Sequence, residues 1–302
     1  MPRTKNNSID LFLDSGAFSA WRQGVDVNIE EYIAFIKKHK EHLSVYANLD
    51  AIGDPVKTLK NQRTMEKAGL EPLPCFHYGE PIKYLEDYVS GYDYIALGGM
   101  VPISSKNLSI WLDDLFANHL TDKKGMPLVK VHGFGMTSLK LMLRYPWYSV
   151  DSTSWVVTGR LGSIYVPRFR KGKYIYDEDS WKVAVSTRSP AKKEAGEHID
   201  TLTAAQHQAV LDYLDSKGFV LGSSTFSMQP GSYELAENER WASKPEKEKD
   251  EREVEHIKKY GVSNDYRLRD KINIMYFLDL EASMPEWPWA WKGSNQSSGF
   301  NI

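Results

Sequence analysis

The first half of the chain alternates short apolar runs with turns that contain polar residues or glycine. Six runs rich in Val, Ile, Leu, Phe and Tyr each end in this way: "IDLFLDSGAF", "LSVYANLDAIGDP", "LPCFHYGE", "YIALGGM", "LVKVHGFGMTS" and "WYSVDSTSW". A short apolar run that stops at such residues is typical of a buried strand followed by a loop. The pattern therefore predicts six strands between residues 9 and 155.

Amphipathic segments fill the gaps between these predicted strands. "NIEEYIAFIKKHK" begins with Asn28, a residue favoured at helix N-caps, and has Glu31 three residues later. The residues expected on its apolar face are Ile29, Ile33, Phe35 and Ile36. Further helices are predicted over "PVKTLKNQRTMEKAG", "NLSIWLDDLFANHL" and "TSLKLMLRYP", and another helix is predicted to begin near Thr203.

The alternation of strand and helix predicts the fold class. It favours parallel strands joined by right-handed crossovers. Six such units exceed a small doubly wound sheet, so we expect an α/β fold of the (β/α)8 TIM-barrel type, with a basic hairpin insertion after strand 6 and extra C-terminal helices. An open sheet is the alternative. The expected organisation is a single catalytic domain over 1–302, with the hairpin and insertion at 156–200 and the divergent closing part of the barrel at 201–302.

Three of the predicted strands end at an acidic residue: Asp14, Asp50 and Asp151. The active site of a barrel lies at the C-terminal ends of its strands, so these carboxylates would share one rim. Taken singly, Asp50 or Asp54 also suits a helix cap. Two carboxylates that face one sugar carbon can divide the work of breaking a glycosidic bond. The same rim is expected to hold His77, Tyr78, Gly98, Gly99, His132 and Gly133.

The glycines and the histidine of this rim each allow two readings. The pair Gly98 and Gly99 either lets a backbone amide approach a flat ligand or forms a plain tight turn. The segment "HGFGM", which contains Gly133, is equally open, and His132 is either an interior histidine or a ligand. No Walker loop and no strand–GxGxxG–helix fingerprint is present, so the sequence gives a nucleotide cofactor no support.

Composition narrows the class of protein. The 302 residues are 41% hydrophobic and 26% charged, as in an ordinary soluble globule, and no apolar stretch approaches the roughly 18 residues of a membrane span. With no secretory signal at the N-terminus, we expect a cytoplasmic protein with no membrane partner. One cysteine, Cys75, excludes an internal disulfide and a cysteine-cluster zinc site. Because the sequence shows no compact His/Asp ligand cluster either, we expect folding and activity without a metal or another cofactor.

Charge is concentrated locally although the net charge is only −2. From Thr158 to Tyr176 the chain carries five cations and no acid, with Tyr165, Phe169, Tyr174 and Tyr176 interleaved. The cations are Arg160, Arg168, Arg170, Lys171 and Lys173. Such a ribbon either contacts phosphates and stacks bases or is a solvated hairpin. The segment at 237–261 mixes both signs, and we expect a solvated helical face there.

Taken in order, these motifs resemble the guanine transglycosylase family, whose enzymes exchange a guanine base in tRNA for a 7-deazaguanine. "LDSGAF" is similar to the family's DSGG-aromatic segment, "NLD" to its base-binding acid, "FHYGE" to its Gln-Gly segment and "LGGM" to its Gly-Gly-Leu turn. "HGFGM" resembles its Met-Gly-Val-Gly stretch and "YSVDSTSW" the strand with the nucleophilic acid. The basic hairpin and "RDKINIMYFLDLEASM" resemble later family features, and the match is best over residues 10–176.

The resemblance implies a TIM barrel and a role for each matched residue. Asp151 would be the nucleophile that attacks C1′ and forms a covalent sugar ester, and Asp14 would be the general acid/base. Phe18 would stack on the base, Asp50 would bind its guanidine-like edge, and Gly98 and Gly99 would present backbone amides. The other residues expected to bind substrate are Ser15, His77, Tyr78, His132 and Gly133. His77 and Tyr78 stand where the family has its glutamine.

The departures from the family favour one branch of it. Bacterial tRNA enzymes carry a zinc site of three cysteines and a histidine after the hairpin, and this chain has only one cysteine. It most resembles the short virus-encoded branch that inserts 7-deazaguanines, such as a preQ-type precursor base, into DNA. DNA is then the expected partner, tRNA the alternative, and the host-cell cytoplasm the expected location. A hydrolase that releases the base, a nucleoside N-glycosidase, and a non-catalytic barrel that binds nucleic acid remain open alternatives, as does the oligomeric state.

Overall fold

The chain forms two compact units, which are described separately. Unit 1 comprises residues 1–152 and 285–302, and unit 2 comprises residues 153–284. The structure, a computed structural model, describes residues 10–136, 138–176, 180–189, 196–242 and 250–293, so parts of the expected segments 156–200 and 201–302 lie outside the described residues. Within the described ranges, no helix is long and apolar enough to cross a membrane.

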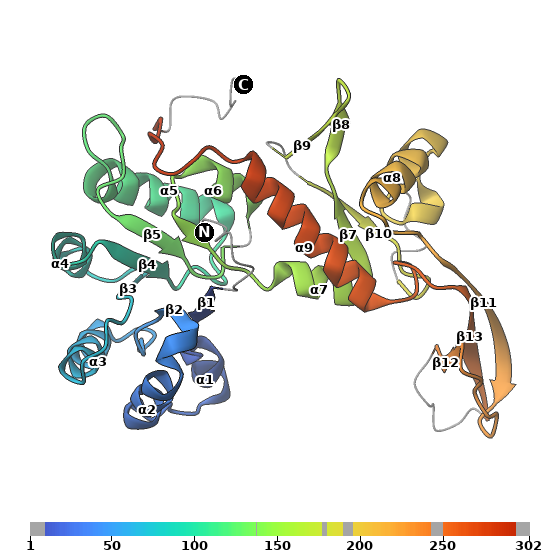
Figure 1. The fold of residues 1–302 in the computed structure, drawn as a ribbon, viewed down its shortest axis with the longest axis horizontal. Helices are drawn as coiled ribbons and strands as arrows, with labels where there is room; N and C mark the ends of the chain where they lie inside the picture. Colours follow the sequence, from blue (N-terminus) through green and yellow to red (C-terminus); the bar gives the residue numbers. More distant parts are fainter. Residues whose placement is uncertain (1–9, 137, 177–179, 190–195, 243–249, 294–302) are drawn as a thin grey trace. The chain divides into compact units, whose positions relative to one another are not determined.

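Six parallel strands of unit 1 follow one another in sequence order (Figure 1). β1 pairs with β2, and β3, β4, β5 and β6 pair in succession, all in parallel. A parallel bridge between Ala47 and Leu73 links the two sets. The strands are β1 (Leu11–Leu13), β2 (Leu43–Tyr46), β3 (Cys75–His77), β4 (Tyr94–Gly98), β5 (Lys130–Gly133) and β6 (Ser149–Val150). All six match the predicted apolar runs.

Helices connect these strands, as the alternating pattern predicts. Asn28 caps α2 by accepting the amides of Glu30 and Glu31, and Asp54 caps α3 by accepting that of Lys57. The helices are α1 (Ala17–Gln23), α2 (Ile29–His39), α3 (Pro55–Lys67), α4 (Lys83–Gly91), α5 (Ser105–Leu115) and α6 (Leu139–Arg144), with the short segments η1 (Lys40–His42) and η2 (Phe116–Leu120). The pattern of apolar runs does not predict α1 and α4.

One face of the parallel strands forms a shared interior. Buried Cys75 and Ala96 pack there with Phe12, Val45 and Phe134, and the five residues come from or next to five different strands. The ring of Phe12 on β1 stacks on that of His132 on β5, with 4.5 Å between centroids. β1 and β5 therefore contact each other through side chains although β2, β3 and β4 lie between them in the strand order. This contact indicates that the sheet is curled.

The opposite face of β1 and β2 packs against helices. Ile36 of α2 and Met65 of α3 are fully buried there, and the hydroxyl of Tyr32 donates to the carbonyl of Ala47 at 2.9 Å. Phe35, expected on the apolar face of α2, is half exposed. The prediction was wrong for this residue because the buried face follows the four-residue spacing of Tyr32 and Ile36. The mixed α/β class with parallel strands is confirmed, whereas an eight-stranded barrel is not shown.

Unit 1 is completed by residues that follow unit 2 in the chain. The indole of Trp287 donates to the carbonyl of Pro146 at 3.1 Å. Trp291 stacks on Tyr145 with 6.2 Å between ring centroids, and its amide donates to the carbonyl of Gly125. These contacts join the end of the chain to α6 and its surroundings.

Unit 2 is built differently, from antiparallel strands and helices. β10 pairs with β7, β8 with β9, and β13 lies between β11 and β12. The strands are β7 (Ser163–Val166), β8 (Arg168–Arg170), β9 (Lys173–Ile175), β10 (Trp181–Ala184), β11 (Ser223–Pro230), β12 (Glu239–Trp241) and β13 (Glu251–Lys259). The helices are α7 (Ser154–Arg160), η4 (Ile199–Thr201), α8 (Ala204–Ser216) and α9 (Tyr266–Ser283). α8 begins after Thr203 with a capping box, which confirms the predicted start, and α9 is one of the extra C-terminal helices that were expected.

The expectation of a helical face at 237–261 was wrong. The described residues of this segment form β12 and β13 of an antiparallel sheet. Val254 and Ile257 are buried, and the guanidinium of Arg240 holds the fully buried carboxylate of Glu255 at 2.8 Å. His256 further links the strands, because one ring nitrogen contacts the Ser227 hydroxyl and the other the Glu239 carboxylate. The mixed charges of this segment, which suggested a solvated helix, are paired across the strands of the sheet.

Candidate active site

Asp14 follows β1 directly and lies at the carboxyl end of the parallel strands. Gly16, with φ at +71°, turns the chain into α1, and its amide donates to Asp14 Oδ1 at 3.4 Å. Burial by surrounding protein atoms raises the pKa of Asp14 above its ordinary value, and the charges of Asp151 and Asp50 raise it further. The amides of Gly16 and Ser15 act in the opposite direction. The net result favours the protonated carboxyl.

Asp151 follows β6, and two neighbours fix its carboxylate. The amide of Gly135 donates to Oδ1 at 2.7 Å, and Nε2 of His132 lies 3.6 Å from the same oxygen. Half of the Asp151 side chain is exposed, at 49%, so the carboxylate remains accessible. Its backbone amide donates to the carbonyl of Gly133 at 3.2 Å. This arrangement orients a carboxylate oxygen that solvent and substrate can reach.

His132 is an interior side chain that faces this rim. It is 2% exposed, and its Nδ1 lies 2.7 Å from the hydroxyl of Ser149, which in turn lies 2.6 Å from the hydroxyl of Tyr94. His132 Nε2 has no hydrogen-bond partner within the described residues. Nδ1 of His132 contacts Ser149, and Nε2 faces Asp151. Ser149 and Tyr94 were not singled out from the sequence, because a serine and a tyrosine within strands give no local signal.

Asp50 accepts hydrogen bonds from two other predicted site residues. The hydroxyl of Ser15 donates to Oδ1 at 2.7 Å, and Nε2 of His77 lies 2.8 Å from Oδ2. The Ser15 hydroxyl also accepts the amide of Ala17 at 3.1 Å. Asp50 is therefore not a helix cap, whereas Asp54 is. The strand-end pattern predicts that Asp50 and His77 lie at one rim. In the structure both His77 and Ser15 contact Asp50 directly.

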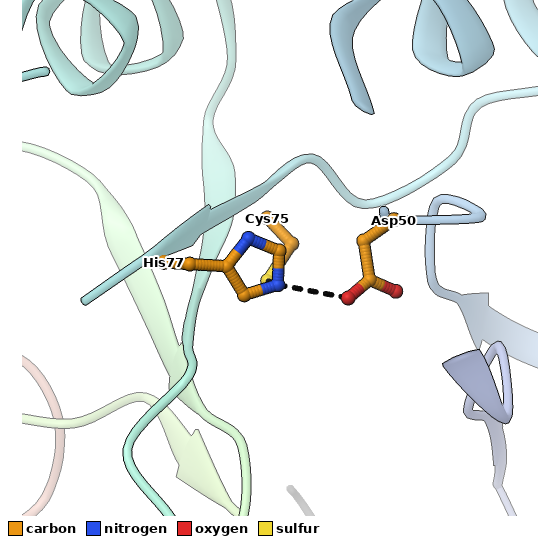
Figure 2. Close-up of side chains that lie close together, drawn as sticks. All are labelled: Asp50, Cys75 and His77. Carbon is orange, nitrogen blue, oxygen red and sulfur yellow. Dashed lines mark hydrogen bonds and ion pairs between the residues drawn. The ribbon is translucent and has the colours of Figure 1, made fainter. Parts of the chain in front are cut away.

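His77 lies in a cluster that local sequence did not reveal. Its Nδ1 lies 3.1 Å from Glu80 Oε1, and its Nε2 lies 3.6 Å from Cys75 Sγ as well as close to Asp50. Figure 2 shows Asp50, Cys75 and His77 turned toward one another. Burial lowers the pKa of His77, but Cys75, Asp50 and Glu80 together raise it above its ordinary value. Burial raises the pKa of the Cys75 thiol.

The expectation that the chain lacks a compact cluster of possible metal ligands was wrong. The donor atoms of Asp50, Cys75 and His77 all lie within 4.8 Å of one another, so a compact ligand cluster does exist. It was missed because Asp50 follows β2, 25 positions before Cys75 in the sequence, and only strand pairing brings the two together. The turn after β3 contained the one local signal, Glu80 three residues after His77.

The two glycines after β4 make room for this cluster. A Cβ atom on Gly98 would lie 2.9 Å from both Cys75 Sγ and His77 Cδ2. Gly99 has φ at +68°, and its missing Cβ would face the amide of Tyr78 at 3.1 Å. Gly98 also accepts the Tyr78 amide through its carbonyl. The ring of Tyr78 itself packs edge-on against Trp111, at 5.2 Å between centroids. That these glycines present amides to a base stays a prediction.

Phe18 lies on the exposed part of α1. It is 39% exposed, and the guanidinium of Arg22 lies 5.9 Å from the centroid of its ring. A hollow of about 210 Å³ next to α1 is lined by Asp50 and by Ala17 and Trp21, but not by Phe18. Stacking of Phe18 on a base therefore stays a prediction.

The basic residues belong to unit 2, so they are described apart from the carboxylates. β8 and β9 form an antiparallel hairpin that exposes Arg168, Arg170 and Lys173 (Figure 1). Its turn is Lys171–Gly172, both with positive φ, as tight hairpins require. Arg160 lies instead at the end of α7. Of the interleaved aromatics, Tyr165 stacks on Tyr276 and Tyr176 donates to Asp279, which leaves Phe169 as the exposed ring.

Comparisons of the whole chain were made with protein-family models, with curated proteins and with solved structures. None of the three gave a match.

Proposed function

We propose that this protein is a base-exchange transglycosylase that replaces guanine in DNA with a 7-deazaguanine derivative through a covalent sugar–aspartate intermediate. The proposal includes the finer fold expectation, in which β1 to β6 belong to a (β/α)8 barrel. The resemblance of six ordered motifs to the guanine transglycosylases supports both parts. The six parallel strands in sequence order supply the corresponding geometry.

The observation that carries the proposal is the pairing of Asp14 and Asp151. Both follow parallel strands of unit 1, and they are close enough that the charge of Asp151 raises the pKa of Asp14. Two carboxyl groups with different environments suit two different roles. The raised pKa of Asp14 keeps its acid form present to a higher pH than in an ordinary aspartate, which suits a general acid. Asp151 is half exposed and oriented by the Gly135 amide, as a nucleophile requires.

In the proposed first step, a carboxylate oxygen of Asp151 forms a bond to C1′ of the target nucleotide. The bond from C1′ to the guanine nitrogen breaks, its electron pair stays on the base, and Asp14 donates a proton to the leaving base. In the second step, the incoming 7-deazaguanine gives a proton to the Asp14 carboxylate. Its ring nitrogen then bonds to C1′ and displaces Asp151, which restores both carboxyl groups. The balance needs no oxidant or reductant.

Asp50 is the proposed anchor for the base edge. Each of its oxygens already accepts one hydrogen bond, from Ser15 and from His77, but a carboxylate has about four acceptor positions. Two remain for donors on the edge of a guanine. The hairpin β8–β9 is the proposed contact for the DNA backbone, since it exposes Arg168, Arg170 and Lys173, and such cations commonly bind phosphates.

The direct test is to incubate the protein with DNA and with tRNA, each containing labelled guanine, in the presence of candidate 7-deazaguanines. Mass analysis of the nucleosides then measures exchange. We expect the deazaguanine nucleoside in DNA and release of labelled guanine in equal amount. Exchange in tRNA alone would favour the tRNA alternative, and guanine release without incorporation would favour a hydrolase. Binding without either reaction would favour a non-catalytic module.

A further inference from the structure

Asp50, Cys75 and His77 form a cluster with three different kinds of metal donor. A carboxylate, a thiol and an imidazole converge within 4.8 Å, on side chains that are 13% exposed for Asp50, 5% for His77 and nearly buried for Cys75. Thiolate and imidazole donors together are typical of zinc sites. The group is distinct from the Asp14–Asp151 pair that carries the proposed reaction.

The distances suit a tetrahedral ion. A zinc–sulfur bond of about 2.3 Å and a zinc–nitrogen bond of about 2.0–2.1 Å place the two donors about 3.6 Å apart at a tetrahedral angle. The distance from Cys75 Sγ to His77 Nε2 is 3.6 Å. Asp50 Oδ2, at 2.8 Å from the same nitrogen, would recede by about half an ångström to reach the corresponding donor separation. A rotation about the Asp50 side-chain bonds is enough for that shift.

Glu80 gives His77 the orientation of a metal ligand. Its Oε1 lies 3.1 Å from His77 Nδ1, and its Oε2 accepts the His77 amide at 3.0 Å. Because Nδ1 faces Glu80, it is Nε2 that faces Asp50 and Cys75. A bound metal ion would replace the Nε2 proton that lies between His77 and Asp50 in the 2.8 Å hydrogen bond. Metal-bound histidines almost always donate their other N–H to a carboxylate such as that of Glu80.

We propose that Asp50, Cys75 and His77 bind one divalent transition-metal ion of the zinc class, with Glu80 holding His77 in place. Three protein donors leave the fourth position of a tetrahedral ion to water. Gly98 keeps the site open, because a Cβ there would press on both Cys75 and His77. The proposal goes beyond the base-exchange function and does not depend on it. It replaces the expectation of metal independence.

The test uses the full-length protein without nucleic acid. After treatment with a chelator, the protein is titrated with Co²⁺, and bound metal is measured by elemental analysis after removal of free ion. We expect one Co²⁺ per chain, with the thiolate-to-cobalt charge-transfer absorption that only a cysteine ligand produces, and displacement by Zn²⁺. Absence of stoichiometric binding, or a bound cobalt without this absorption, would overturn the proposal.

Substitutions identify the ligands. Cys75→Ser should remove the charge-transfer band, and Glu80→Gln should weaken binding about 10- to 100-fold while the band remains. His42→Gln, at a histidine whose side chain is 65% exposed, is the matched control and should change neither. Circular dichroism verifies that each variant is folded. A band that survives Cys75→Ser, or an affinity that falls equally in His42→Gln, would show that cobalt binds elsewhere.

Discussion

The two units of this molecule place different chemistry on different architectures. Unit 1 aligns parallel strands in sequence order, so residues far apart in the chain, such as Asp14, Asp50 and Asp151, follow strand ends at one edge. Unit 2 is antiparallel, and its cations lie on a hairpin formed by near neighbours in sequence. In this chain, a cluster of site residues therefore forms through long-range strand pairing, whereas the basic surface forms on two short strands joined by one turn.

The largest effect is expected at the nucleophile of unit 1. Asp151→Asn should abolish both base exchange and the covalent protein–DNA adduct, because an amide is too weak a nucleophile to attack C1′. Trapping and digesting the adduct gives its attachment site. Asp54→Asn, which replaces one good helix cap by another, is the control and should retain both. An adduct on Asp14, or one formed by Asp151→Asn, would reverse the assignment.

Asp14→Asn should slow exchange by about 10²- to 10⁴-fold, the usual contribution of a general acid or base. The pH dependence sharpens this prediction. Because the pKa of Asp14 is raised, the acid form persists above its ordinary range, and guanine release in a single turnover should fall as pH rises through the raised pKa. That alkaline decline should be missing from the variant. An unchanged pH profile would exclude Asp14 as the proton donor.

Substitutions on α2 test how unit 1 is packed. Ile36→Ala removes a fully buried side chain and should lower the free energy of unfolding by about 2–5 kcal/mol. Phe35→Ala, on the same helix but half exposed, should cost much less. Denaturant titration measures both. Equal losses of unfolding free energy would indicate that Phe35 lies on the buried face of the helix, as the sequence pattern predicts.

The hairpin of unit 2 should contribute smaller and less specific effects. Replacing Arg168, Arg170, Lys171 and Lys173 by alanine should weaken binding to many DNA sequences alike. The slope of log K against log salt should become shallower by about 0.9 for each lost phosphate contact. A variant with Lys258 and Lys259 replaced, both exposed on β13, is the control. If the slope is the same in all three proteins, the hairpin is only a solvated surface.

The smallest effect is a gain in stability from losing the Asp14 charge. Below its ordinary pKa of 3.8 this carboxyl is protonated in both folded and unfolded chains and contributes no difference. As pH rises through the raised folded pKa, ionisation costs the folded state free energy. Asp14→Asn should therefore have the higher melting temperature at neutral pH and lose that advantage in acid. Asp26→Asn, at a side chain 95% exposed, should show neither trend.

Periodicity predicted the parts of the fold that local sequence specifies. All six parallel strands, the Asn28 and Asp54 caps and the start of α8 follow from apolar runs and capping residues. The short helices α1 and α4 were missed, and β13 was mistaken for a helix because Glu255 and His256 find partners only across the sheet. The pattern placed Asp50 and His77 at one rim, and the two side chains are in contact. Glu80, Ser149 and Tyr94 were not predicted, because their roles come from side-chain contacts.

The interruption of unit 1 by unit 2 has a consequence for folding order. Trp287 and Trp291 reach Pro146 and Tyr145 only after all of unit 2 has been synthesised, since the chain leaves unit 1 at Ser152 and re-enters it at Pro285. Loop-closure entropy grows slowly, by about 0.6 kcal/mol per doubling of loop length, so this long detour costs little stability. Contacts so distant in sequence do slow folding. On the ribosome, α6 and its neighbours would lack these contacts until Trp287 and Trp291 emerge.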